Sequence, residues 1–214
     1  MVFIATSLSS STGSAVRRPC LAMVGALALA GCQAPSPSSV TASLAPTPAF
    51  NTRSPAEVAV LPVEDGTPDG AAQRHLTLLR QEVMRQMVDR LFAPLTAGSV
   101  DAALKSAPPV APGESMLVPA TLQKLAGHAG EQATFALRID QWDERLLQVD
   151  RKLRFQFQAA LVGSDGVLLW GGTLQGEVKA GGVGPAPLDR EGMARSCIEI
   201  AVRELLQRLP RRVV

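Results

Sequence analysis

The chain has 214 residues, 46% of them hydrophobic, and its 21 basic and 19 acidic residues leave it almost neutral. This length suits one ordinary domain, and the balanced charge excludes the basic footprint of a nucleic-acid-binding protein. The sequence contains no metal-ligand spacing and no nucleotide-binding loop in a strand-helix context. We therefore expect no metal, no cofactor and no nucleic-acid partner.

The first 31 residues have the three parts of a secretory signal. Arg17 and Arg18 are the only charged residues there, and an apolar run at 21–30 follows them. That run is too short to cross a bilayer, which takes about 20 apolar residues. The order of these parts predicts export and removal of residues 1–31 rather than a membrane-spanning helix.

The quartet Leu29-Ala30-Gly31-Cys32 ends this segment and resembles the lipobox of bacterial lipoprotein precursors. In such precursors the cysteine thiol receives a diacylglyceryl group, the chain is cut before it, and the new amino terminus is acylated. The resemblance implies that Cys32 carries the lipid. Two or three acyl chains give stable anchoring, whereas one is marginal. Gln33 follows the cysteine. Lipoproteins of this type that lack an acidic residue at that position usually go on to the outer membrane, so the resemblance implies the periplasmic face of the outer membrane.

Residues 32–54 are rich in Pro, Ser, Ala and Thr and carry almost no charge. Such a composition buries little apolar surface, so it predicts an extended tether that lifts the domain off the membrane and is dispensable for folding. A single folded domain is expected at 55–214.

Three cysteines occur, and two of them have roles before the domain begins. Cys20 leaves with the signal and Cys32 is the predicted lipid site, so Cys197 remains without a disulfide partner. Apolar neighbours at helical spacing predict that Cys197 is a small core side chain and not a nucleophile.

The domain is expected to open with a buried strand at 57–63 and a turn-rich loop at 64–70. A helix at 71–95 follows, because apolar residues recur there every three or four positions. Its other side, which includes His75 and Arg80, is expected to face solvent.

The rest of the domain alternates strands and helices and then becomes a meander. The predicted elements are a strand at 99–104, a helix at 119–126, strands at 134–142, 153–161 and 167–174, and a helix at 188–209. Gly166 permits a tight hairpin between the last two strands. The order β-α-β-α-β-β-β-α predicts an α/β fold with helices packed on a mixed sheet and an antiparallel carboxyl-terminal meander.

Two tryptophans and three acids on these strands are candidate functional residues. Trp170 is expected in the core, whereas Trp142, at a strand end, is expected to be partly exposed and to contact a partner. Asp140, Asp143 and Glu144 lie close together and suit a cation or an acid-base pair. A solvated strand end is the interpretation that we favour for them.

Segments 58–62, 137–142 and 160–171, with the lipobox, resemble the family of bacterial outer-membrane lipoproteins typified by the meningococcal genome-derived vaccine-candidate lipoprotein. The hairpin motif also occurs in the curli-secretion lipoprotein CsgG and in LpoB-type activators of peptidoglycan synthases. These share a fold similar to the amino-terminal domain of TolB. The likeness covers about residues 54–180 and departs at 96–130. It implies a role in envelope assembly, transport or partner binding, without catalytic residues.

The sequence lacks a nucleophile with a nearby base, so we expect a protein that is not an enzyme. The expected partners are the membrane, through the lipid anchor, and an envelope protein or further copies of the chain. The alternative is an envelope hydrolase or small-ligand binder that uses the loop at 64–70. Glu64, Asp65 and Asp69 lie there, after a strand, where α/β proteins often bind ligands.

Overall fold

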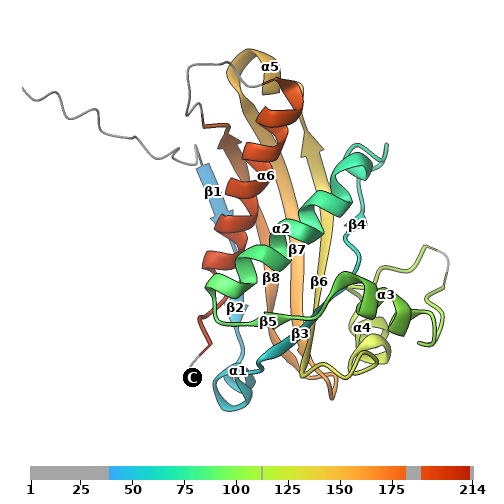
Figure 1. Cartoon of the computed structure of the whole chain (residues 1–214). Helices are drawn as coiled ribbons and strands as arrows, with labels where there is room; N and C mark the ends of the chain where they lie inside the picture. Colours follow the sequence, from blue (N-terminus) through green and yellow to red (C-terminus); the bar gives the residue numbers. More distant parts are fainter. Residues whose placement is uncertain (1–38, 112, 182–188, 213–214) are drawn as a thin grey trace, which may run out of the picture. The chain divides into compact units, whose positions relative to one another are not determined.

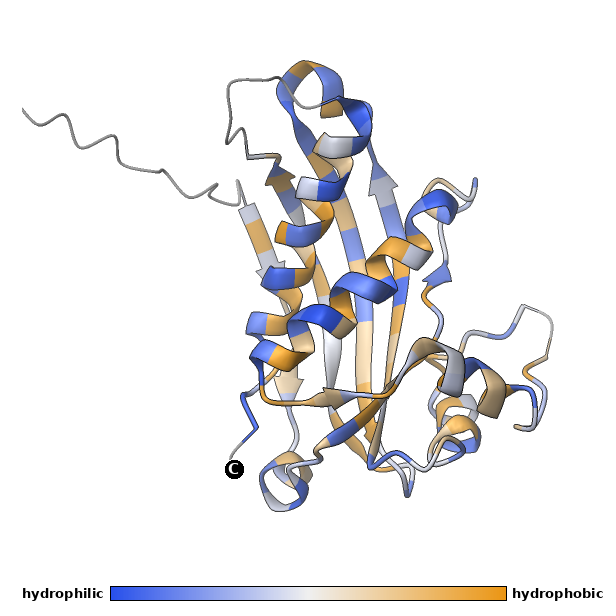
Figure 2. Cartoon of the chain, viewed as in Figure 1, coloured by the Kyte–Doolittle hydropathy of each residue, from blue (hydrophilic) through white to orange (hydrophobic). Residues whose placement is uncertain are grey.

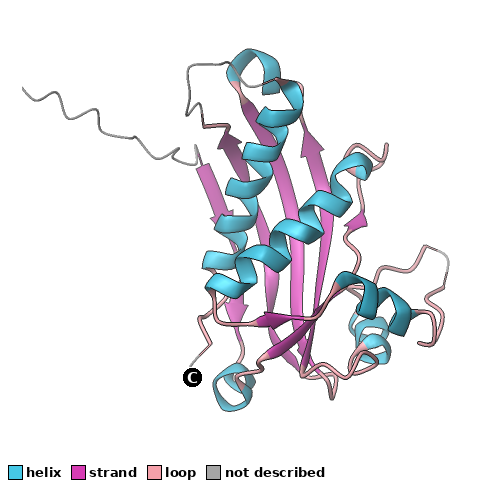
Figure 3. Ribbon diagram, viewed as in Figure 1, coloured by secondary structure: helices cyan, strands magenta, loops and turns pink. Residues whose placement is uncertain are grey.

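The computed structural model describes residues 39–111, 113–181 and 189–212. The predicted signal sequence, the lipobox and residues 33–38 of the predicted tether lie outside these ranges. The described part is a mixed sheet with helices packed against it, which confirms the predicted α/β class (Figures 1 and 3). None of the helices in the described ranges is both long and apolar enough to span a bilayer.

The strands are β1 (Ser39–Ala42), β2 (Ala45–Pro46), β3 (Glu57–Val60), β4 (Glu64–Asp65), β5 (Ala93–Pro94), β6 (Ala133–Asp143), β7 (Lys152–Gly163) and β8 (Leu168–Lys179). Their order in the sheet is β1-β8-β7-β6-β3-β5, and β2 also pairs with β8 and β4 with β6. Strands β6, β7 and β8 run antiparallel, which confirms the predicted meander. Strand β3 is parallel to both β5 and β6.

The helices are α1 (Pro48–Arg53), the 3-10 turn η1 (Gln73–His75), α2 (Leu76–Asp89), α3 (Ala97–Leu104), α4 (Pro119–Leu125), α5 (Leu147–Asp150) and α6 (Arg190–Gln207). Helices α2 and α6 contact each other and lie across one face of the sheet (Figure 1). Figure 2 shows apolar and hydrophilic residues alternating along both helices, as expected when one side of a helix meets a core.

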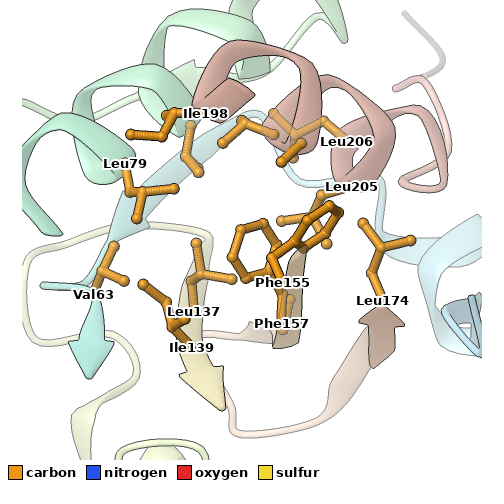
Figure 4. Close-up of a cluster of buried hydrophobic side chains, with 14 of the residues drawn as sticks. Val63, Leu79, Leu137, Ile139, Phe155, Phe157, Leu174, Ile198, Leu205 and Leu206 are labelled. Carbon is orange, nitrogen blue, oxygen red and sulfur yellow. The ribbon is translucent and has the colours of Figure 1, made fainter. Parts of the chain in front are cut away.

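The main core lies between the sheet and these two helices. Phe155 and Phe157 of β7 point toward Leu79 of α2 and Leu205 of α6 (Figure 4), and all four side chains are buried. Successive strand residues face opposite sides, so the polar residues between the aromatic ones lie on the other face. Gly166, at φ +81°, forms the predicted tight turn between β7 and β8.

A smaller core lies on the opposite face of the sheet, near β3. Ala136, Ala160 and Val162 from the strands meet Leu122 and Leu125 of α4 there. On β7, Ala160 and Val162 come after polar residues that lie on the same face. The α3–α4 side therefore covers only part of that face.

The predicted tether is wrong for residues 39–54, which belong to the folded domain. Val40 and Ala42 of β1 pack against the main core, and Phe50 of α1 is only 3% exposed. A Cβ at Gly172 of β8 would lie 2.7 Å from the carbonyl oxygen of Ser43. Glycine there thus lets the β1–β2 segment approach β8 closely.

The strand predicted at 99–104 is also wrong, because these residues lie in α3. The Thr96 side chain accepts a hydrogen bond of 3.2 Å from the backbone N–H of Ser99 and caps this helix. The strand that pairs with β3 in this region is the two-residue β5. It takes residues that the sequence assigned to the end of the preceding helix.

Arg80 is buried, contrary to the solvated face predicted for that side of α2. Its Nε and Nη2 donate to the carbonyl oxygen of Val60, at 3.0 and 2.8 Å. Its Nη1 lies 2.7 Å from Oδ1 of Asp101 in α3. The guanidinium thus satisfies a carbonyl at the end of β3 and joins α2 to α3.

Candidate functional site

A buried carboxylate joins three parts of the chain at the end of β6. Glu144 follows that strand, and its side chain is only 8% exposed. Its Oε1 lies 2.5 Å from Nε2 of His75 and accepts a hydrogen bond of 2.8 Å from Nε1 of Trp142. Its Oε2 pairs with the guanidinium groups of Arg74 and Arg190. One side chain therefore ties β6 to η1 and to the start of α6.

These contacts decide the charge of Glu144. Burial opposes ionisation, but hydrogen bonds from His75 and Trp142 and the positive charge of Arg74 outweigh it and lower the pKa of Glu144 to about 2. His75 donates only when Nε2 carries the proton, so it cannot also accept from Arg74 Nε, 3.0 Å away. A carboxylate that stays ionised and fully engaged is poorly suited to proton transfer near neutral pH.

The partly exposed Trp142 expected from the sequence is wrong. Its side chain is 5% exposed, and its ring stacks on Phe157 at 6.5 Å and lies 5.3 Å from the ring of His75. His75 is buried as well, although the sequence placed it on a polar helix side. A tryptophan enclosed in this way cannot act as an exposed partner contact in the folded domain. Trp170 is buried, as predicted.

Two open hollows flank the Glu144 cluster. One, of about 530 Å³, lies between α2 and α6, and the other, of about 510 Å³, lies beside the end of β6. Arg74 and Arg190 line both, and their side chains are about half exposed. Both guanidinium groups already pair with Glu144, so part of their positive charge is neutralised within the cluster.

The three neighbouring acids do not converge on one site. Asp140 pairs with Arg138 at 2.9 Å, and Asp143 pairs with Arg145 at 2.7 Å. The favoured solvated strand end is wrong for Glu144, which is enclosed. Across the described ranges, no group of three or more His, Cys, Asp or Glu residues is placed to hold a metal ion.

The acids of the loop at 64–70 serve the fold. Glu64 accepts hydrogen bonds of 2.5 Å from the Ser115 hydroxyl and from the backbone N–H of Met116. Asp65 accepts from the backbone N–H and the hydroxyl of Thr67 and from a backbone N–H at the start of the next helix. These contacts give both carboxylates a structural role, which weakens the hydrolase or ligand-binder alternative.

Cys197 is the small core side chain that the sequence predicts. It is fully buried in α6, and burial raises the pKa of its thiol to about 12. The thiol therefore stays protonated and unreactive at neutral pH.

The part of the sheet that α3 and α4 leave open carries a row of polar side chains. Thr41, Gln175, Gln156 and Gln141 lie in register across β1, β8, β7 and β6. Three of them are exposed, and Gln156 is half-buried. Amides and hydroxyls on one face of an antiparallel sheet are typical of contact with water or with a polar partner.

No protein-family model and no curated protein matches the chain. The solved structures that are similar in fold include the following three. The PelC dodecamer from Paraburkholderia phytofirmans has 13% identity and a TM-score of 0.47, over 82% of this chain and 100% of that one. Lipoprotein GNA1162 from Neisseria meningitidis has 17% identity and a TM-score of 0.42, over 72% of this chain and 99% of that one. The LpoB C-terminal domain from Salmonella enterica has 17% identity and a TM-score of 0.37, over 58% of this chain and 82% of that one.

The second and third of these structures correspond to proteins that the sequence motifs resemble. At such low identities and TM-scores, the case for a function rests on this chain's own residues.

Replacing Glu144 with Gln should lower the free energy of unfolding by about 2 to 3 kcal/mol at neutral pH, because its charged partners lose their carboxylate. The folded-state pKa of Glu144 lies below its ordinary 4.5, so its contribution is present above pH 4.5 and is lost as the pH falls toward 2. Urea unfolding at several pH values measures both effects.

The matched control for this substitution is Glu199→Gln on α6, whose side chain is 48% exposed. It should change the free energy of unfolding by no more than about 0.5 kcal/mol. An unfolding curve for Glu144→Gln that coincides with that of the unaltered chain at neutral pH would show that the cluster adds no stability.

Proposed function

We propose that this chain is a lipid-anchored module of the bacterial cell envelope, held at the periplasmic face of the outer membrane through Cys32. It acts without catalysis, by binding another envelope component or further copies of itself. The lipobox quartet, behind Arg17 and Arg18 and a short apolar run, is the observation that carries the anchor. Gln33 supports the outer membrane as the location, because the chain then resembles lipoproteins that lack an acidic residue after the cysteine.

The chemistry of the described residues supports the binding role. Three of the six carboxylates that the sequence offers as candidates, Glu64, Asp65 and Glu144, are each engaged by several donors. The thiol of Cys197 is enclosed in the main core. Groups held in this way stabilise one conformation, and they leave the outer surfaces of the domain as the means by which it acts.

Replacing Cys32 with Ala tests the anchor in cells, because it removes the sulfur that receives the lipid. The unaltered protein should appear in the outer-membrane fraction, and the Cys32→Ala variant should lose that association. Cys20→Ala is the matched control, since it changes a cysteine within the predicted signal and should leave the distribution as it is. A Cys32→Ala variant that remains in the outer-membrane fraction would contradict the anchor.

The binding role is tested on the purified lipidated chain and on intact envelopes. Sedimentation in detergent should show species larger than one chain, or chemical crosslinking in envelopes should give a discrete adduct with another protein. A single chain in detergent, together with no adduct in envelopes, would contradict this half of the proposal.

A further inference from the structure

The folded domain begins close to the cysteine proposed as its anchor. Only six residues, 33–38, separate Cys32 from Ser39, the first residue of β1. The seven residue steps between them span at most about 25 Å when fully extended. An anchored Cys32 therefore keeps the start of β1 within that distance of the membrane surface, much nearer than a tether reaching to residue 54 would.

The register of the sheet identifies which end of the domain this is. Ser39 pairs with Glu177, Glu177 with Arg154, and Arg154 with Asp143. All four lie at the end where α5 connects β6 to β7 (Figure 1). The hairpin at 164–167 lies at the other end of β8, about 35 Å farther along the strands. The available reach is shorter, so the domain cannot stand upright on this hairpin while the anchor is inserted.

The tip of the near end is the connection between β6 and β7, residues 145–151, here called the α5 turn. Val149 in this turn is 80% exposed, the highest value among the large apolar side chains of the described ranges. The Arg145 side chain is 86% exposed, and Arg151 is exposed as well. An exposed apolar residue with an arginine four positions before it and another two positions after it suits a lipid headgroup layer, where apolar groups insert and arginines meet phosphates.

The edge of β1 and β2 is the competing surface, because it also starts near the anchor. Residues 39–46 contain no charged residue, and at 39–44 the side chains that do not pack on the main core are hydroxyls. The α5 turn keeps one net positive charge even with Asp150. Arg145 pairs with Asp143, but its high exposure leaves it open to a phosphate.

We infer that the α5 turn faces the lipid headgroups of the membrane that holds Cys32, with Val149 at their surface. This orientation rests on the proposed anchoring. It directs the α3–α4 side of the domain away from the membrane (Figure 1), where a partner in the periplasm can reach it.

The test uses single-cysteine labelling of the full lipidated chain. Val149→Cys, Thr41→Cys and Ser164→Cys each place a fluorophore at an exposed position, in the α5 turn, on the β1 edge and in the far hairpin. Cys197 is buried and does not compete for the label. Each labelled chain is added to vesicles of phosphatidylethanolamine and phosphatidylglycerol that contain a lipid with a nitroxide on its headgroup. Flotation and fluorescence are measured on the same samples.

All three chains should float with the vesicles. The nitroxide should quench the label of the Val149→Cys variant most strongly and the label of the Ser164→Cys variant least. Quenching at Thr41→Cys or Ser164→Cys that equals or exceeds the quenching at Val149→Cys would overturn the orientation alone. Chains that fail to float would contradict the anchor itself, and the orientation with it.

Discussion

Replacing Trp170 with Ala should cost about 3 to 5 kcal/mol of unfolding free energy, the range for truncating a fully buried tryptophan. Trp170 has no exposed surface, and its ring stacks on Phe135 at a centroid distance of 6.2 Å. Its Nε1 donates a hydrogen bond of 3.0 Å to the carbonyl oxygen of Arg208, beyond the end of α6. The substitution therefore empties part of the main core and releases the end of the last helix at once.

Thermal and urea unfolding of Trp170→Ala measure this loss. Leu168→Ala is the matched control, because Leu168 lies on the same strand with 48% of its side chain exposed. It should change the free energy of unfolding by less than about 1 kcal/mol. Equal effects of the two substitutions would contradict the position assigned to Trp170.

Removing residues 39–51 should destabilise the domain by more than about 4 kcal/mol, since the loss of Phe50 alone approaches that value. A chain that begins at Thr52 lacks β1 and β2, which pair with β8 from Ser39↔Glu177 to Pro46↔Trp170. Strand β8 would then be an edge strand with unpaired backbone groups, and the part of the core that β1 and α1 cover would be exposed to water. The composition of this segment predicts that it is dispensable, whereas its contacts in the structure predict that the domain needs it. The experiment distinguishes these two expectations.

A chain that begins at Ser39 is the control for this truncation, because it keeps every described element of the domain. Its melting temperature should match that of the full mature chain, whereas the chain from Thr52 should melt much lower or lose cooperative unfolding. Identical melting of the two truncated chains would restore the prediction of a dispensable tether.

Local alternation accounts for the parts of the fold that the sequence predicts well. Strand β7 alternates apolar and polar residues for most of its length, and Gly166 marks its turn, so the meander can be read from neighbours in the chain. The two-residue β5 and the four-residue β1 offer no such pattern. Strand β1 is recognisable only once β8 is present beside it, because an edge strand takes its stability from one neighbour.

Long-range ion pairs explain why the sequence misplaced the polar residues. His75 and Glu144 are 69 positions apart, and Arg80 uses a carbonyl 20 positions earlier. Each looks like a solvated polar group within its own segment. Only the packing of η1 and α6 against β6 shows that His75 and Glu144 are enclosed, and only the packing of α2 on β3 and α3 shows it for Arg80. Arg74 and His75, neighbours at the start of the helix, form no sequence pattern that indicates this cluster.

The amino terminus of the mature protein tests the central claim most directly. The protein is purified from detergent-solubilised membranes, and the mass of its amino-terminal peptide is measured. We expect a chain that begins at Cys32 and carries the added mass of a diacylglyceryl group and an amide-linked acyl chain. An unmodified Cys32, or a mature chain that begins at another residue, would contradict it.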